Sequence, residues 1–494
     1  MSITDITDDT AGKKGNTTRL QKGSIGTPGI VFIVIAGAAP LTAMAGNVPL
    51  GMALGNGTGL PGTYVLVGAL LLIFSVGYAA MSRHVVHAGA FNAYIGFGFG
   101  RTAGAVAAFV AAFAYNASTT SLAAAFAFFT KSAIHDHTGL SVPWEVLALA
   151  AVLVAGLMNL RGVGVSTSIL ATLMALELAM LFAINVAIMM ERGPHFSPSV
   201  FEPGSVLGGG AAIALLFGIL SFAGFEATAV FSEEVRNPRR TVGRATYVVV
   251  VLMAVFFSVS SWAAVSAYDG TDSVATARND PGDFVFALGR TYLGGWSVPV
   301  ISALVVLSFI ASVIAVHNMA SRYMYSLGRS GLLPAWLAVT HHRLRTPHRA
   351  GSVQVLISSA VLGLFALIGA DPLTDVVPAL AGLFTIAFLG LMAATSFAIL
   401  RTFVRKIPGQ HGLWTTRVAP LVSGVLMTLT TCLVVVNYGV LVGSDSLFSR
   451  ALPAFLLTLA VAWGIHAHRR RERREAAHRF AIPSAEQDRN AKEL

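Results

Sequence analysis

The sequence predicts an all-α polytopic membrane protein with about 12 transmembrane helices. The mean hydropathy is +0.71, and 55% of the 494 residues are hydrophobic while only 11% are charged. Soluble domains carry about 25% charged residues. Apolar stretches recur along the chain, each near the roughly 20 residues that a helix needs to cross a bilayer. Lysine and arginine are also distributed very unevenly between the loops on alternate sides of these stretches.

Twelve stretches are long and apolar enough to span a membrane. In chain order they are residues 28–54, 62–82, 102–130, 142–160, 165–190, 211–231, 245–267, 296–326, 352–369, 377–400, 418–442 and 452–467. The third and the eighth exceed the bilayer thickness, so we expect them to tilt or to project. The 49 glycines are typical of helices that pack closely within a membrane.

The basic residues predict the orientation. Of the 33 Lys and Arg residues, five fall on one side of the predicted spans: Lys131, Arg192, Arg278, Arg290 and Arg450. Because basic loops stay in the cytoplasm, we expect a multi-pass protein of the cytoplasmic membrane with both termini cytoplasmic. The net charge of +10 then reflects topology and not nucleic-acid binding, and the basic run at 468–474 is expected to contact anionic lipid.

The chain shows no sequence signal for a cleaved leader, a disulfide or a bound cofactor. Residues 1–27 form a polar, basic tail without the apolar region of a cleaved signal peptide. A single cysteine, Cys432, excludes an internal disulfide. No cluster has metal-ligand spacing, so we expect no metal and no cofactor beyond a coupling ion.

The sixth span is interrupted near its middle. It reads AAIALLFGILSFAGFEATAV, and Gly224 and Glu226 lie near its centre. A carboxylate at that depth is costly unless it has a partner or a role. An irregular backbone there is tolerated only beside protein or a water-filled cavity. The segment therefore predicts a discontinuous helix that lines a polar site.

The first span carries a second candidate break. Pro40 lacks an N–H and obstructs the preceding turn, and Gly37 and Gly46 flank it, which places the break at about 38–43. A simple proline kink is the alternative. Spans one and six would each be the first of five, and broken helices at matching positions indicate a transporter site. Their free N–H and C=O groups suit a carboxylate and an ammonium, both of which an amino acid carries.

Four motifs resemble those of the amino acid–polyamine–organocation (APC) superfamily of permeases. The two specific ones are SFAGFEATAVFSEEVRNPRRTVGRA (Ser221–Ala245) and SRYMYSLGRSGLLPAW (Ser321–Trp336). NLRGVGVS (Asn159–Ser166) and HAGAFNAYIGFGFG (His87–Gly100) are weaker, since His87 and Ala90 replace a proline and a glycine of the family pattern. The resemblance covers about residues 25–440.

The resemblance implies a LeuT-like fold with two inverted five-helix repeats and discontinuous helices 1 and 6. The repeats occupy 28–400, helix 11 (418–442) completes a transporter domain of residues 28–442, and helix 12 (452–467) precedes a basic cytoplasmic tail (468–494). It implies a secondary active transporter that moves an amino acid by alternating access, with proton-coupled symport expected. A polyamine or organic amine permease and an amino acid exchanger are the alternatives. A membrane enzyme or a channel is disfavoured, because no nucleophile–base constellation and no continuous polar stripe is present.

The resemblance also implies where the substrate binds. In span one the residues are Ala39, Pro40, Leu41, Thr42 and Ala43, although Thr42-Ala43-Met44 stands where the family shows G-S-G. In span six they are Phe222, Ala223, Gly224 and Phe225. Either phenylalanine is an aromatic gate or a packing contact. Thr120, in a polar stripe with Tyr115, Asn116 and Thr119, occupies a substrate-facing position of the family.

Three ionisable residues are candidates for coupling or gating. Glu226 matches the family's span-six glutamate and either binds a proton or caps freed N–H groups. Glu177 stands where some proton-coupled relatives have a lysine, so it couples a proton, pairs with a neighbouring span or helps to hold sodium. His317 in span eight is either a proton carrier or a packed hydrogen-bond donor. The expected partners are an amino acid or amine substrate and membrane lipid, with no nucleic acid; the sequence indicates no oligomeric state.

Overall fold

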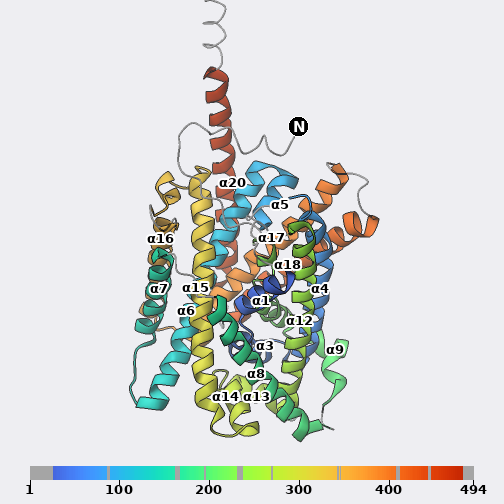
Figure 1. Ribbon diagram of the computed structural model, residues 1–494, viewed down its shortest axis with the longest axis vertical. Coiled ribbons are helices and arrows are strands. Elements are labelled where there is room, and N and C mark those ends of the chain that lie inside the picture. The colour runs from blue at the N-terminus through green and yellow to red at the C-terminus, as the bar shows by residue number, and fades with distance from the viewer. Residues whose placement is uncertain are drawn as a thin grey trace, which may run out of the picture.

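The described residues of the computed structural model are 26–85, 90–161, 167–193, 196–230, 237–268, 271–341, 344, 346–405, 407, 412–442 and 447–481. Within these ranges every regular element is a helix. Figure 1 shows the long helices running side by side along the long axis of the molecule.

Ten helices of the described chain are long and apolar enough to cross a membrane, which confirms a multi-pass membrane protein. The helices that contain these spans are α4 (Leu60–Met81), α6 (Arg101–Thr138), α7 (Trp144–Arg161), α8 (Thr167–Arg192), α12 (Pro238–Ala267), α15 (Ser297–Arg329), α16 (His348–Leu367), α17 (Val377–Arg405), α18 (Ala419–Val436) and α20 (Leu447–Ala481).

The two remaining predicted spans are both interrupted. The first consists of α1 (Thr27–Ala38), α2 (Pro40–Thr42), the π-helical turn η2 (Ala43–Asn47) and α3 (Val48–Ala53). The sixth consists of α10 (Ala211–Ser221), a turn, and α11 (Ala227–Val230). The breaks predicted from Pro40 and from Gly224 and Glu226 are thereby confirmed.

Shorter helices join the long ones. They are α5 (Ala90–Phe99), α9 (Pro203–Val206), α13 (Thr271–Asn279), α14 (Phe284–Tyr292) and α19 (Tyr438–Leu441), with 3-10 turns η3 (Gly57–Gly59), η5 (Pro198–Phe201) and η7 (Ala335–Ala338) and π-helical turns η8 (Pro372–Val376) and η9 (Trp414–Val418). In Figure 1, α5 and the distal part of α20 lie at one end of the molecule and α9, α13 and α14 at the other.

Helix α20 is longer than the predicted span 452–467. It continues to Ala481 and projects beyond the other helices in Figure 1. The continuation is rich in Arg, Glu and Ala, which are strong helix formers. Hydropathy marks only the apolar part of such a helix, so it predicts a span that ends at residue 467 and a tail that begins at residue 468.

Small residues bring the helices close together. A Cβ atom on Gly104 of α6 would lie 2.9 Å from the Cα atom of Gly96 in α5. On the other face of α5, a Cβ on Gly98 would lie 2.8 Å from the Cα of Ala398 in α17. The short helix α5 therefore docks on α6 and α17 by backbone contact, as the glycine content led us to expect.

Candidate functional site

The first helix breaks at a strained residue. Ala39 lies between α1 and α2 with φ 44° and ψ 76°, a left-handed conformation that non-glycine residues rarely adopt. Pro40 follows as the first residue of α2 and cannot donate a backbone hydrogen bond. From Pro40 to Ala53 the chain is again helical, through the π-helical turn η2. The break thus leaves the carboxyl end of α1 and the amino end of a new helix next to each other.

The second break is organised by Glu226. Between α10 and α11 the chain turns at Phe222–Glu226, with Gly224 at φ 104°. The Glu226 carboxylate is fully buried and accepts two hydrogen bonds, from the Gly224 backbone N–H at 2.9 Å and from the Tyr115 hydroxyl at 2.5 Å. The first bond holds the turn itself, because Gly224 precedes α11, and the second joins the break to α6. Whether Glu226 binds a proton or caps the start of α11 stays a prediction.

The two breaks face each other. A Cβ atom on Gly224 would point towards the backbone nitrogen of Ala38, at 4.0 Å. On the same pair of segments, the Asn47 side-chain amide donates to the Ser221 hydroxyl at 3.1 Å. The predicted substrate-binding stretches 39–43 and 222–225 are therefore brought together, although Ala43 and Phe222 are 179 positions apart in the chain (222 − 43).

Glu177 lies beside the first break. Its carboxylate, 2% exposed, has the Ser308 hydroxyl and the Leu41 backbone N–H as hydrogen-bond partners. The Thr42 and Ser308 hydroxyls share a further hydrogen bond of 2.7 Å. A buried carboxylate thus joins α8 and α15 to the first residues after the break. Such a group can bind a proton or a cation at a point where movement of the first helix would alter its surroundings.

Tyrosines surround the second break. Tyr78 of α4 donates to the Glu226 backbone oxygen at 3.1 Å and packs edge-on against Tyr94 of α5, with ring centroids 5.2 Å apart. Tyr115 of α6 stacks on Tyr323 of α15 at 5.4 Å. Among these, the sequence analysis singled out Tyr115 alone. Tyr94 lies in the motif His87–Gly100 and Tyr323 in the motif Ser321–Trp336, and these motifs could have marked both tyrosines as candidates. For Tyr78 the sequence offers only a polar aromatic residue in an apolar span.

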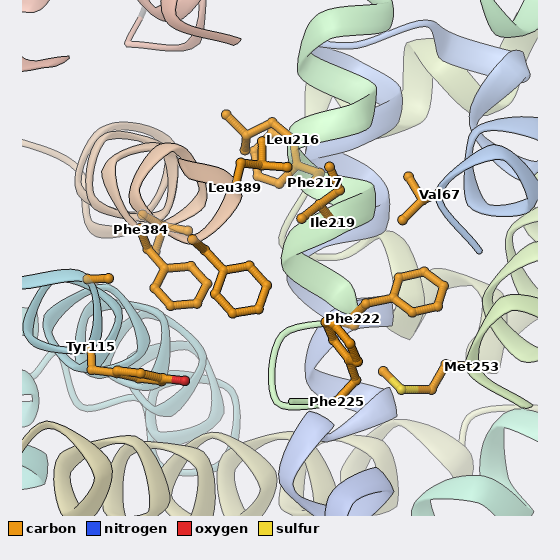
Figure 2. Packing of buried hydrophobic residues seen from close by; sticks show 14 of the residues in the cluster. Val67, Tyr115, Leu216, Phe217, Ile219, Phe222, Phe225, Met253, Phe384 and Leu389 are labelled. Carbon is orange, nitrogen blue, oxygen red and sulfur yellow. The ribbon is translucent and has the colours of Figure 1, made fainter. Parts of the chain in front are cut away.

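Phe222 and Phe225 pack behind the second break. The Phe222 ring contacts Tyr64 and Phe257, with centroids at 6.5 and 5.9 Å. The Phe225 ring packs edge-on against Phe74 and Phe388 at 6.0 and 6.3 Å. Figure 2 shows Phe222 on the side of Met253, whereas Tyr115 approaches from the opposite side. Both phenylalanines are in packing contacts here, and their role as a gate stays a prediction.

The remaining candidates lie further along the helices. The Thr120 hydroxyl bonds the Asn116 carbonyl at 2.9 Å and the Ser358 hydroxyl of α16 at 3.0 Å. Within the described part of the chain, neither ring nitrogen of the buried His317 has a hydrogen-bond partner. Within the described ranges, no group of three or more His, Cys, Asp or Glu side chains could hold a metal ion.

Fold and site define a polytopic membrane protein with two helix breaks that face each other in its interior. The chain matches the amino acid permease family over residues 25–462 and belongs to that family, which is one of transporters and not of enzymes. The match agrees with the resemblance recognised in the sequence.

Individual relatives match only part of the chain and at low sequence identity. The chain is similar to an uncharacterized transporter of Mycobacterium tuberculosis, 28% identical over 226 residues, which are 45% of this chain and 48% of the relative. It is similar to a branched-chain amino acid permease of Lactococcus lactis, 24% identical over 309 residues (58% and 64%), and to cationic amino acid transporter 7, chloroplastic, of Arabidopsis thaliana, 28% identical over 171 residues (34% and 28%). The chain spans about half the length of the mycobacterial transporter it matches.

Proposed function

We propose that this protein is a secondary active transporter that moves an amino acid across the cytoplasmic membrane by alternating access. The observation that carries the proposal is the apposition of the two breaks, seen in the approach of Gly224 to the Ala38 nitrogen. Helix ends that meet in this way offer N–H groups to a carboxylate and C=O groups to an ammonium. A zwitterionic amino acid presents both groups a short distance apart. In the LeuT-like arrangement implied by the resemblance, the two broken helices are the first helices of the two five-helix repeats.

The site favours a neutral amino acid over a polyamine. A dication needs uncommitted carboxylates, because a buried charge must be paired. Among the described residues the buried acids beside the breaks are Glu177 and Glu226, and both already accept hydrogen bonds from protein groups. The Lactococcus relative is a branched-chain amino acid permease, which is consistent with an apolar substrate side chain here.

Proton-coupled symport is the transport mode we propose. Glu177 is the coupling residue in this proposal, since its carboxylate bonds the Leu41 N–H immediately after the break. Protonation would weaken that bond to the first helix and so alter the balance between inward- and outward-facing states. Sodium at the same carboxylate, with the Thr42 and Ser308 hydroxyls beside it, is the alternative. The excess of basic residues on one side of the spans supports cytoplasmic termini.

Uptake by proteoliposomes tests the proposal. Purified protein is reconstituted and given an inward-directed proton gradient, a sodium gradient or no gradient, with labelled neutral amino acids, cationic amino acids and putrescine offered in turn. We expect accumulation of a neutral amino acid that depends on the proton gradient. Accumulation driven by sodium would reassign the coupling ion, and gradient-independent uptake that requires internal amino acid would identify an exchanger. If no amino acid or amine is taken up or competes, the proposed function is wrong.

A further inference from the structure

A buried polar cluster lies where α6, α7, α15 and α16 pack against one another. Its members are each less than 9% exposed: Thr119, Asn159, His317, Ser321, Gln354 and Ser358. Polar side chains inside a membrane bundle usually hydrogen-bond across helices. The unusual feature here is that several polar atoms of the cluster have no partner in the described chain.

Two side-chain amides in the cluster have a fixed orientation. Asn159 donates through Nδ2 to the side-chain Oδ1 of Asn318 at 2.7 Å and to the Ser321 hydroxyl at 3.0 Å, which uses both of its N–H bonds. The Thr119 hydroxyl donates to the Tyr115 backbone oxygen at 2.8 Å, so it accepts from Gln354 Nε2, also at 2.8 Å. The amide oxygens of Asn159 and Gln354 must therefore face the remaining space.

These two oxygens and both ring nitrogens of His317 are buried without a partner among the residues that the structure describes. A neutral imidazole supplies one donor and one acceptor, and each amide oxygen is an acceptor. The cluster thus has more acceptors than donors. A buried polar atom without a hydrogen bond is destabilising, so the cluster needs a small ligand that donates at least two hydrogen bonds. Water is such a ligand, and buried waters typically make about three hydrogen bonds to otherwise unsatisfied groups.

Two of the unpartnered atoms lie close to each other beside Gly351. A Cβ atom on Gly351 would lie 2.3 Å from Asn159 Oδ1 and 3.5 Å from His317 Nε2. The two atoms are therefore separated by at most the sum of these distances, about 5.8 Å. A single water with hydrogen bonds of about 2.8–3.0 Å can bridge such a separation. Gln354 lies one turn further along the buried face of α16.

We propose that His317, Asn159 and Gln354 bind a water molecule that links α7, α15 and α16. The water donates to Asn159 Oδ1 and Gln354 Oε1 and accepts from His317 Nε2–H, so three of the four unpartnered atoms gain a partner and His317 Nδ1 does not. The site differs from the two helix breaks and does not depend on the proposed function. Through Thr119 it also supports the backbone of Tyr115, whose hydroxyl reaches Glu226.

A high-resolution cryo-EM structure of the full chain in lipid nanodiscs tests the site. We expect density for a water within about 2.7–3.2 Å of both His317 Nε2 and Asn159 Oδ1. In Gly351→Ala the added methyl group would lie 2.3 Å from Asn159 Oδ1, so the Asn159 amide must shift; the density should be lost and the melting temperature in detergent should fall. Gly363→Ala on the same helix is the control, because a Cβ there meets nothing within 4 Å; it should keep the density and the melting temperature.

Two results would overturn the water site. One is a wild-type structure without the density, in which His317 bonds Asn159 directly. The other is density that persists unchanged in Gly351→Ala. If Gly351→Ala does not fold, His317→Leu serves instead, since it removes the imidazole without adding bulk. The density should then be lost from the Asn159 oxygen while the four helices keep their places, and density that remains there at full strength would reject His317 as a ligand.

Discussion

The Tyr115 hydroxyl donates a hydrogen bond of 2.5 Å to Glu226 Oε1, and this bond joins the long helix α6 to the break between α10 and α11. The two residues come from segments 111 positions apart. The other carboxylate oxygen of Glu226 holds the Gly224 N–H. The side chain therefore fixes both the shape of the turn and its distance from α6, which are the quantities that must change if this segment moves during transport.

Removal of the Tyr115 hydroxyl should impair transport more than folding. In Tyr115→Phe the ring still stacks on Tyr323, but Glu226 loses one of its two hydrogen bonds. A hydrogen bond to a charged group is worth about 1.5–3 kcal/mol. Because the turn must move away from α6 during transport, this energy enters the barrier to that movement, and we expect about a tenfold or greater change in the initial uptake rate. Tyr323→Phe is the matched control, since it keeps the same ring stack. Equal rates in the wild type and Tyr115→Phe would show that the bond plays no part in transport.

Gly224 should not tolerate alanine. Its φ of 104° strains any residue with a Cβ by about 1–3 kcal/mol. Packing is not the cause, because the nearest atom to the added methyl group is the Ala38 nitrogen at 4.0 Å. The methyl group would, however, stand between the two breaks. We expect Gly224→Ala to lower both the melting temperature and the apparent substrate affinity in uptake assays.

Gly390→Ala provides the comparison for that variant. Gly390 lies inside α17, and a Cβ there meets nothing within 4 Å. Alanine favours the helix over glycine by up to about 1 kcal/mol, so this variant should be as stable as the wild type or slightly more so, with normal uptake. A Gly224→Ala protein that behaved like Gly390→Ala would argue against a rigid turn at 222–226.

Local signals explain why both breaks could be predicted from the sequence. Pro40 removes a backbone donor, and a glycine beside a glutamate in an apolar run marks irregular backbone at membrane depth. The long spans were equally accessible, because their signal is hydropathy over about 20 residues. The charged end of α20 was not, since helix propensity without an apolar face leaves no mark in a hydropathy profile.

The hydrogen-bond partners of the site residues could not be predicted from the sequence. Tyr78, Tyr94 and Tyr115 reach Glu226 or one another from three different helices. Which tyrosine meets the carboxylate depends on helix rotation and tilt, and these are set by contacts along whole helices. The same holds for Glu177: the sequence placed it deep in a span, but its bond to the Leu41 N–H follows from tertiary packing.

The left-handed conformation of Ala39 at the first break predicts how substitutions there change the stability of the protein. Ala39 has φ 44°, a conformation that costs an L-residue roughly 1–2 kcal/mol. Glycine would relieve this strain but would lose about 0.5–1 kcal/mol through its freer unfolded chain, so Ala39→Gly should change the melting temperature little. Ala39→Val adds a β-branched side chain to the same conformation and should lower it clearly. The opposite order of stability would show that the break does not sit at Ala39.

Glu177→Gln should separate substrate binding from ion coupling. Glutamine keeps the size of the side chain and, through Oε1, an acceptor for the Leu41 N–H, but it cannot release or take up a proton. We expect binding of substrate to persist, measured by scintillation proximity, while the stimulation of uptake by an imposed proton gradient is lost. Glu177→Asp keeps the charge on a shorter side chain and should retain part of that stimulation. If Glu177→Gln proteoliposomes still respond fully to the gradient, Glu177 is a structural residue that ties α8 and α15 to the first break, and the proton must bind elsewhere.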